Sequence, residues 1–158
     1  MICAGIDAGS RAIKVALVDS DTLALVGKGV VNQGVHQKDL AATLLDQVLQ
    51  DAGATRTDIC STVATGYGRN AVALADTTIT EITCHARGVH HQQSEARTVV
   101  DIGGQDSKLL HLSDGGYVRD FAMNDRCAAG TGRFLEVVAE KLEIALVDIG
   151  SLAAAADA

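Results

Sequence analysis

The sequence predicts an α/β protein made of two related halves, and three observations support that fold class. Short apolar runs of strand length alternate with amphipathic stretches of helix length along the 158 residues. Apolar residues make up 47% of the chain, which is enough for a core even though aromatic residues contribute only 3%. The third observation is a repeat, because "GIDAGSRAIKVALVDSD" and "VVDIGGQDSKLLHLSDG" align at their Asp, Gly and Lys residues.

The repeat joins an apolar strand, an aspartate and a glycine-containing turn. Lys14 lies seven residues after Asp7, and Lys108 lies seven residues after Asp101. Because unrelated loops seldom agree in such spacing, we expect two halves that each present an Asp-x-Gly hairpin to a cleft between them.

Strands are expected wherever a short apolar run is bounded by turn residues. "AGSR" and "SDT" separate the first three runs, and "SDGG" separates two later ones. The expected strands cover residues 2–7, 12–19, 23–31, 59–65, 97–102, 108–112 and 117–122.

Helices are expected where apolar residues recur at helical spacing. In residues 36–53 five such positions precede Gly53, the residue type that most easily ends a helix. Further helices are expected around residues 81–92 and from Thr131 onward, and the Ala-rich end "DIGSLAAAADA" resembles an interrupted helix or a loop. We expect two subdomains, residues 1–95 and 96–158, in a chain that is truncated before the second is complete.

Charge and hydropathy exclude several functional classes. The formal net charge of −7 argues against a nucleic-acid surface, which would need clustered Lys and Arg. No apolar run approaches the roughly 18 residues of a membrane span, and "MICAGIDAGS" has no basic region before an apolar one. A cytoplasmic protein with neither nucleic-acid nor membrane partners is expected.

The two Asp-x-Gly hairpins are candidate phosphate-binding loops. Backbone N–H groups of a Gly- and Ser-rich turn form a concave site for phosphate oxygens, and a carboxylate at the strand end can hold Mg²⁺ through water. The first loop would use Asp7, Gly9, Ser10 and Lys14. The second would use Asp101, Gly103, Gly104, Gln105 and Asp106.

Ordinary hairpin turns are the alternative explanation, because Asp and Gly are common in turns. The matched pair makes this explanation weaker than it is for either loop alone. The chain has neither the GxxxxGK[ST] pattern of a P-loop nor a GxGxxG turn after its first strand. The loops by themselves are compatible with an ATPase or with a small-molecule kinase, and a non-catalytic fragment is a third alternative.

The four cysteines are widely spaced and form no CxxC pair, which argues against a disulfide framework. Cys3 and Cys60 lie in strand-like stretches and are expected to be small buried core residues. Cys84 is expected to pack within a helix. Cys127, in "MNDRCAAGTGRF", could be a core residue, a nucleophile or one ligand of a shared group.

Five segments together resemble one family. "GIDAGSRAIK", "TGYGRN", "EITCHARG", "VVDIGGQDSK" and above all "MNDRCAAGTGRF" are similar to the 2-hydroxyacyl-CoA dehydratase activators and the ATPase subunits of benzoyl-CoA reductase. The resemblance covers nearly the whole chain, from Gly5 to about Ala154. It implies an actin-like (ribonuclease H-like) ATPase fold with duplicated βββαβα-type halves, the second incomplete.

The resemblance also implies an activity and its cofactors. Family members are homodimers with one 4Fe–4S cluster at the dimer interface, held by two cysteines of each subunit. ATP binding and hydrolysis are coupled to the transfer of one electron at low potential from the cluster to a dehydratase or reductase component. A ferredoxin or flavodoxin is the expected electron donor to the cluster.

Individual residues take roles from the same resemblance. Cys127 matches the first cluster ligand, Gln105 is a candidate for orienting the attacking water, and Asp101 would assist catalysis. Asp7 and Asp101 would hold Mg²⁺ through water. The helix that starts near Thr131 is expected to direct free N–H groups at the cluster, which would favour the thiolate.

Two departures from the family pattern are evident. Arg11 stands where family members usually have a small hydroxyl residue. The second cluster cysteine and the Gly-rich adenosine loop are expected beyond Ala158.

Overall fold

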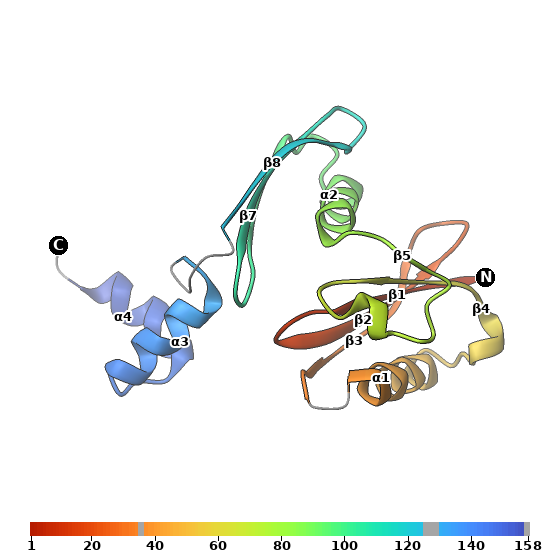
Figure 1. Cartoon of the computed structure of the whole chain (residues 1–158), viewed down its shortest axis with the longest axis horizontal. Helices are drawn as coiled ribbons and strands as arrows, with labels where there is room; N and C mark the ends of the chain where they lie inside the picture. Colours follow the sequence, from red (N-terminus) through yellow and green to blue (C-terminus); the bar gives the residue numbers. More distant parts are fainter. Residues whose placement is uncertain (35–36, 125–129, 157–158) are drawn as a thin grey trace. The chain divides into compact units, whose positions relative to one another are not determined.

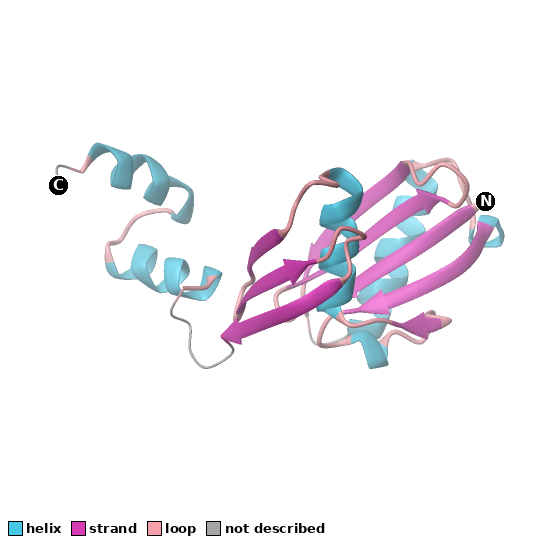
Figure 2. Ribbon diagram, turned by 90° about the horizontal axis from the view of Figure 1, so that it is seen from above, coloured by secondary structure: helices cyan, strands magenta, loops and turns pink. Residues whose placement is uncertain are grey.

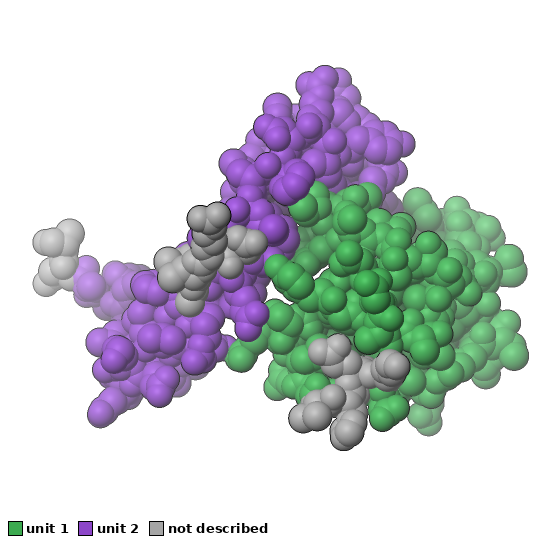
Figure 3. All heavy atoms as spheres, in the orientation of Figure 1, with its two compact units in different colours: residues 1–85 green, residues 86–158 purple. Residues whose placement is uncertain are grey.

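The computed structural model describes residues 1–34, 37–124 and 130–156. The chain divides into two compact units, Met1–His85 and Ala86–Ala158, which are coloured separately in Figure 3. The boundary falls within one helix, so that helix contributes to both units. Each unit has its own β-sheet.

The first unit is a five-stranded mixed sheet with the strand order β3-β2-β1-β4-β5. Strand β2 runs antiparallel to both of its neighbours, β1 and β3, whereas β4 runs parallel to both β1 and β5. Figure 2 shows the sheet beside helix α1. The elements are β1 (Ile2–Ala8), β2 (Ala12–Asp19), β3 (Leu25–Asn32), α1 (Gln37–Asp51), β4 (Ile59–Thr65), β5 (Thr77–Thr78) and the start of α2 (Glu81–Gln92), with short 3₁₀ turns at Arg56–Asp58 and Arg69–Ala71.

The core of the first unit lies between α1 and one face of the sheet. Alternation along β1 buries Ala4, Ile6 and Ala8 on that face and leaves the intervening residues for the other. Leu45 and Leu49 of α1 are each 2% exposed against it. The opposite face of β1 therefore carries Cys3, Gly5 and Asp7.

The second unit contains a three-stranded antiparallel sheet in the order β6-β7-β8. Figure 1 shows its strands β7 and β8 and the helices that follow them. The elements are β6 (Thr98–Ile102), β7 (Ser107–Leu112), β8 (Val118–Asn124), α3 (Gly132–Lys141), a 3₁₀ turn at Leu146–Asp148 and α4 (Ile149–Ala155).

The α/β fold class is confirmed, and both sheets contain the same antiparallel triplet of strands. Residues 12–19 and 59–65 form strands with the predicted bounds. Gly53 has φ +68 just after α1, as expected of a helix-ending glycine. The short strand β5 is an element that the sequence pattern did not reveal, because two residues are too few to show periodicity.

Among the residues that the structure describes, no helix combines the length and the apolar character needed to cross a membrane.

Candidate nucleotide site

The first candidate phosphate-binding loop is the turn between β1 and β2. The β-ladder places Asp7 directly opposite Lys14, and Lys14 Nζ lies 2.7 Å from Asp7 Oδ2. The Gly9 N–H donates to the Ala12 carbonyl at 3.1 Å, which closes the turn. The Gln33 amide at the end of β3 donates to the Gly9 carbonyl at 2.8 Å and so fixes the turn from the side.

The second loop, between β6 and β7, repeats this geometry. Asp101 is the ladder partner of Lys108, and Lys108 Nζ lies 3.3 Å from Asp101 Oδ2. The Gly103 N–H donates to the carbonyl of Asp106 at 2.8 Å, in the same relative positions as Gly9 and Ala12. The shared seven-residue spacing therefore corresponds to a shared arrangement of carboxylate, ammonium and turn.

The two lysines differ sharply in their environment. The Lys14 side chain is 56% exposed, so its ammonium is accessible to a ligand. The Lys108 side chain is 3% exposed and also lies 2.9 Å from Asp106 Oδ2. Lys14 is thus suited to contact a phosphate, whereas Lys108 neutralises carboxylates and holds the second loop together.

Two buried oxygen atoms lie beside the first candidate loop. Asp7 Oδ1 and Thr65 Oγ1 have no hydrogen-bond partner among the described residues. Asp7 and Thr65 are neighbours across the β1–β4 ladder, and both line a cavity of about 260 Å³. Because buried oxygens without partners are costly, a hydrated cation or a polar ligand group would fit there. The donor set, a carboxylate and a hydroxyl, suits Mg²⁺.

The "TGYGRN" loop supports the same carboxylate. Gly66 has φ +87, and a Cβ atom there would lie 2.5 Å from Asp7 Oδ1 and 2.6 Å from the Ala8 carbonyl oxygen. Only glycine allows the loop to approach the end of β1 so closely. The Gly68 N–H donates to the Ala8 carbonyl at 2.8 Å, and the Arg69 guanidinium donates to the Gly66 carbonyl at 3.0 Å. Arg69 therefore stabilises its own loop.

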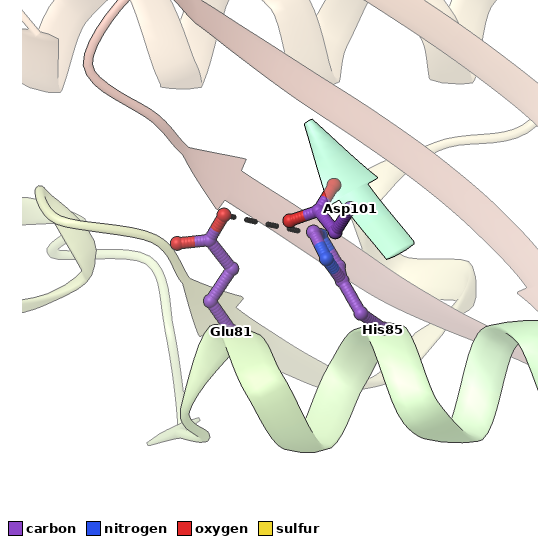
Figure 4. Close-up of side chains that lie close together, drawn as sticks. All are labelled: Glu81, His85 and Asp101. Atoms are coloured by element: carbon purple, nitrogen blue, oxygen red, sulfur yellow. Dashed lines mark ion pairs between the residues drawn. The ribbon is translucent and has the colours of Figure 1, made fainter. Parts of the chain in front are cut away.

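Helix α2 completes the lining of the cavity. Cys84 and His85 both border it, together with Gly5 and Lys14. Figure 4 shows Glu81 and His85 one turn apart on α2, with His85 Nε2 3.9 Å from Glu81 Oε1. The sequence predicts Cys84 to be a packed helix residue and gives no indication that Thr65 belongs to the site, although both line the cavity. The "EITCHARG" motif was the available signal for α2, but nothing in the sequence indicates that β4 ends beside Asp7.

The N-terminus of α3 differs from its prediction. The helix begins at Gly132 after Thr131, as expected, but two of its first N–H groups are already bonded. The Gly132 N–H donates to the Gly103 carbonyl at 2.9 Å and the Arg133 N–H to the Gly104 carbonyl at 3.0 Å. The expectation of free N–H groups is wrong for these two, because they anchor α3 to the second loop.

The remaining predicted site residues lie at the turn tips or outside the described residues. Ser10 and Gln105 are exposed at the tips of the two loops. Cys127, the predicted cluster ligand, lies outside the described residues.

The expectation that Cys3 and Cys60 are small buried core residues is wrong. Cys60 is exposed, and its Sγ lies 3.4 Å from Cys3 Sγ. The two strands that carry these cysteines are neighbours in the sheet, a relationship that sequence spacing does not reveal.

Comparison with known proteins identifies the family. The model of the BadF/BadG/BcrA/BcrD ATPase family matches residues 4–158. The chain belongs to this ATPase family. It is 45% identical over 152 residues to the activator of lactoyl-CoA dehydratase from Anaerotignum propionicum, covering 96% of this chain and 58% of the relative.

Two solved structures of activators share the fold. Component A of the Acidaminococcus fermentans (R)-2-hydroxyglutaryl-CoA dehydratase matches with a TM-score of 0.92 and 39% identity, over 100% of this chain and 60% of that chain. The activator of the 2-hydroxyisocaproyl-CoA dehydratase from Clostridium difficile, solved with bound ADPNP, matches with a TM-score of 0.89 and 38% identity, over 100% and 58%. The chain thus spans a little over half the length of these relatives.

Proposed function

We propose that the full-length protein is an ATP-dependent reductive activator of a 2-hydroxyacyl-CoA dehydratase component. Binding and hydrolysis of ATP would be coupled to the transfer of one electron at low potential. The observation that carries the proposal is the first Asp–Lys hairpin, with its buried, unpartnered carboxylate oxygen, in a chain of this ATPase family. The bound ADPNP of a solved relative supports a nucleotide ligand.

In this proposal the first loop holds the phosphates and the metal. Lys14 Nζ binds Asp7 Oδ2, and Asp7 Oδ1, which has no hydrogen-bond partner among the described residues, would accept from a water molecule of hydrated Mg²⁺. The Gly9 backbone would lie close to the phosphates, and the Ser10 N–H would donate to a phosphate oxygen, since the Gly9 N–H closes the turn. The ammonium of Lys14 would neutralise phosphate charge, since it is more than half exposed.

The second loop is proposed to act on the terminal phosphate. Gly103 and Gly104 would bring backbone close to phosphate oxygens, and the exposed Gln105 amide would orient the attacking water. Asp101 would hold Mg²⁺ through a second water. Lys108 and Asp106 keep the loop in shape, because the ammonium binds both aspartates.

The electron-transfer part of the proposal depends on Cys127. We propose that its thiolate is one ligand of a 4Fe–4S cluster shared by two subunits of a homodimer. When bound, such a cluster supplies a single electron at low potential. A ferredoxin or flavodoxin is the proposed donor and the dehydratase component the acceptor.

Anaerobic purification of the full-length protein tests the cluster. We expect brown protein that contains iron and absorbs in the visible charge-transfer region, and Cys127→Ser should remove both colour and iron. Cys84→Ser is the matched control. Cys84 lines the cavity and is not a proposed cluster ligand, so this variant should keep the colour and the iron. A colourless, iron-free wild type after anaerobic reconstitution would contradict the proposal.

ATP turnover distinguishes the remaining alternatives. Hydrolysis that accelerates with an electron-accepting dehydratase supports the activator. Acceleration by a benzoyl-CoA reductase component instead would assign the chain to the other branch of the family. Transfer of phosphate from ATP to a small hydroxyl or carboxyl compound would favour a kinase.

A further inference from the structure

The pair Cys3 and Cys60 is a feature that nucleotide binding does not use. Their sulfur atoms lie 3.4 Å apart, although the residues are 57 positions apart in the sequence. Both belong to the first unit, and they lie near the N-terminal ends of β1 and β4. Asp7 and Thr65, in contrast, lie at or next to the C-terminal ends of the same two strands.

A local irregularity of the sheet brings the thiols together. The β1–β4 ladder pairs Ile2 with Ile59 and then Cys3 with Ser61, so Cys60 is an extra residue on β4. Such a bulge turns the side chain away from its regular direction. The Cys60 thiol donates to the Ile2 carbonyl at 3.2 Å, which holds it against β1 beside Cys3.

The two thiols have different access to reagents. Cys60 is exposed, whereas Cys3 is half-buried. The pKa of the Cys3 thiol is raised above its ordinary value, first by the hydrogen bond with Cys60 and then by burial. An external reagent would therefore reach Cys60 first, and Cys3 would react second from close range.

We propose that Cys3 and Cys60 form a reversible intramolecular disulfide when the protein meets a low-molecular-weight disulfide. The Cys60 thiolate attacks one sulfur of the reagent, the reagent's S–S bond breaks, and one reagent thiol leaves with a proton. The Cys3 thiolate then attacks Cys60 Sγ, forms the protein disulfide and expels the second reagent thiol. Two protein thiols are oxidised and one reagent disulfide is reduced to two thiols.

The bond would join the starts of two strands that belong to different parts of the chain. Because the cross-link closes a long loop of the unfolded chain, it should raise the melting temperature of the first unit by roughly 5–10 °C. The phosphate loop lies at the other end of the same strands, so the modification would act on stability without occupying the nucleotide site.

Oxidised glutathione followed by alkylation and tryptic mapping tests the proposal. We expect residues 1–11 and 57–69 to appear as one linked peptide, with the loss of two hydrogen atoms in the intact mass, and dithiothreitol should separate them. Cys84 and Cys127 fall in other peptides, so the assignment is unambiguous. The melting temperature should rise with oxidation and return with reduction.

Serine variants provide the controls. Cys3→Ser should leave glutathione attached to Cys60 and abolish the thermal shift, whereas Cys84→Ser should still form the Cys3–Cys60 link. A wild-type chain that accumulates only the glutathione adduct on Cys60, or links Cys60 to another cysteine, would overturn the proposal.

Discussion

The carboxylate of Asp7 illustrates how single residues define the candidate site. One of its oxygens binds Lys14, and the other is buried without a partner among the described residues. Gly66 passes so close to that second oxygen that any side chain would displace it. The site therefore depends on one charged residue and on the absence of a side chain at another.

Gly66→Ala should weaken nucleotide binding in the full-length protein. The new Cβ would lie 2.5 Å from Asp7 Oδ1 on a backbone with φ +87, so the loop or the carboxylate must move. We expect affinity for a fluorescent ATP analogue to fall at least roughly tenfold, as the Mg²⁺-binding oxygen is displaced. Gly53→Ala is the matched control, since its φ is +68 but nothing lies within 4 Å. Unchanged affinity in Gly66→Ala would show that Asp7 Oδ1 does not take part in nucleotide binding.

Lys108→Met and Lys14→Met should differ strongly in stability. Lys108 is buried between Asp101 and Asp106, so its replacement removes a buried cation that binds both carboxylates and should cost about 3 kcal/mol. Lys14 is largely exposed, and its replacement should cost less than about 1 kcal/mol. Urea unfolding measures both. Equal losses of unfolding free energy would show that the two lysines contribute equally to stability, which would contradict the prediction.

At the scale of elements, close packing joins α1 to the sheet through the glycines of β3. Gly27 and Gly29 face α1, while Lys28 between them is exposed on the other side. The absence of side chains at these positions lets the helix approach the strand. The N-terminus of α3 is attached differently, by two N–H groups that bind carbonyls of the second loop.

Gly29→Ala should weaken the packing of α1. A Cβ there would lie 2.6 Å from Val48 Cγ2 and 3.0 Å from Leu44 Cδ1, so the helix must shift. We expect a loss of about 1–3 kcal/mol in urea unfolding. Lys28→Ala, one residue away on the opposite face, should change stability by less than about 0.5 kcal/mol. Tolerance of both changes would mean that α1 is more loosely packed than its contacts indicate.

Across the whole molecule, the buried apolar residues are distributed unevenly. The main hydrophobic cluster of the described residues lies in the first unit, where Ile13 and Leu17 are fully buried. The second unit buries Ala86, Leu110, Leu112 and Ala139, and exposes Val100 on its sheet. Local stability should follow this difference, because burial of apolar surface is the main stabilising contribution.

Hydrogen exchange should therefore protect the first sheet more than the second. Amides of β2 and β7 are a fair comparison, as each is flanked by strands on both sides. We expect exchange in β2 to be roughly tenfold or more slower, since opening it exposes the main core. Mass spectrometry of peptic fragments measures both strands in one sample. Equal protection would show that apolar burial does not set local stability here.

Most helices and strands could be predicted because their signals are local. Alternation within residues 12–19 and the glycine after α1 depend on neighbours in the chain. The Asp7–Lys14 pair follows from a hairpin, where spacing and side-chain contact are directly related. β5 and the bulge at Cys60 had no such signal, because each depends on a strand distant in sequence.

The sequence by itself determined the α/β fold class, the two matched Asp–Lys hairpins and, through its motifs, the family. Only the tertiary structure decided that Thr65 lies beside Asp7, that Lys108 is buried while Lys14 is exposed, and that Cys60 lies against Cys3. The physical reason is the parallel pairing of β1 with β4. This pairing joins two strands that are separated in sequence by α1. The register and the bulge of the pair are set by the packing of the whole sheet rather than by the conformational preferences of neighbouring residues.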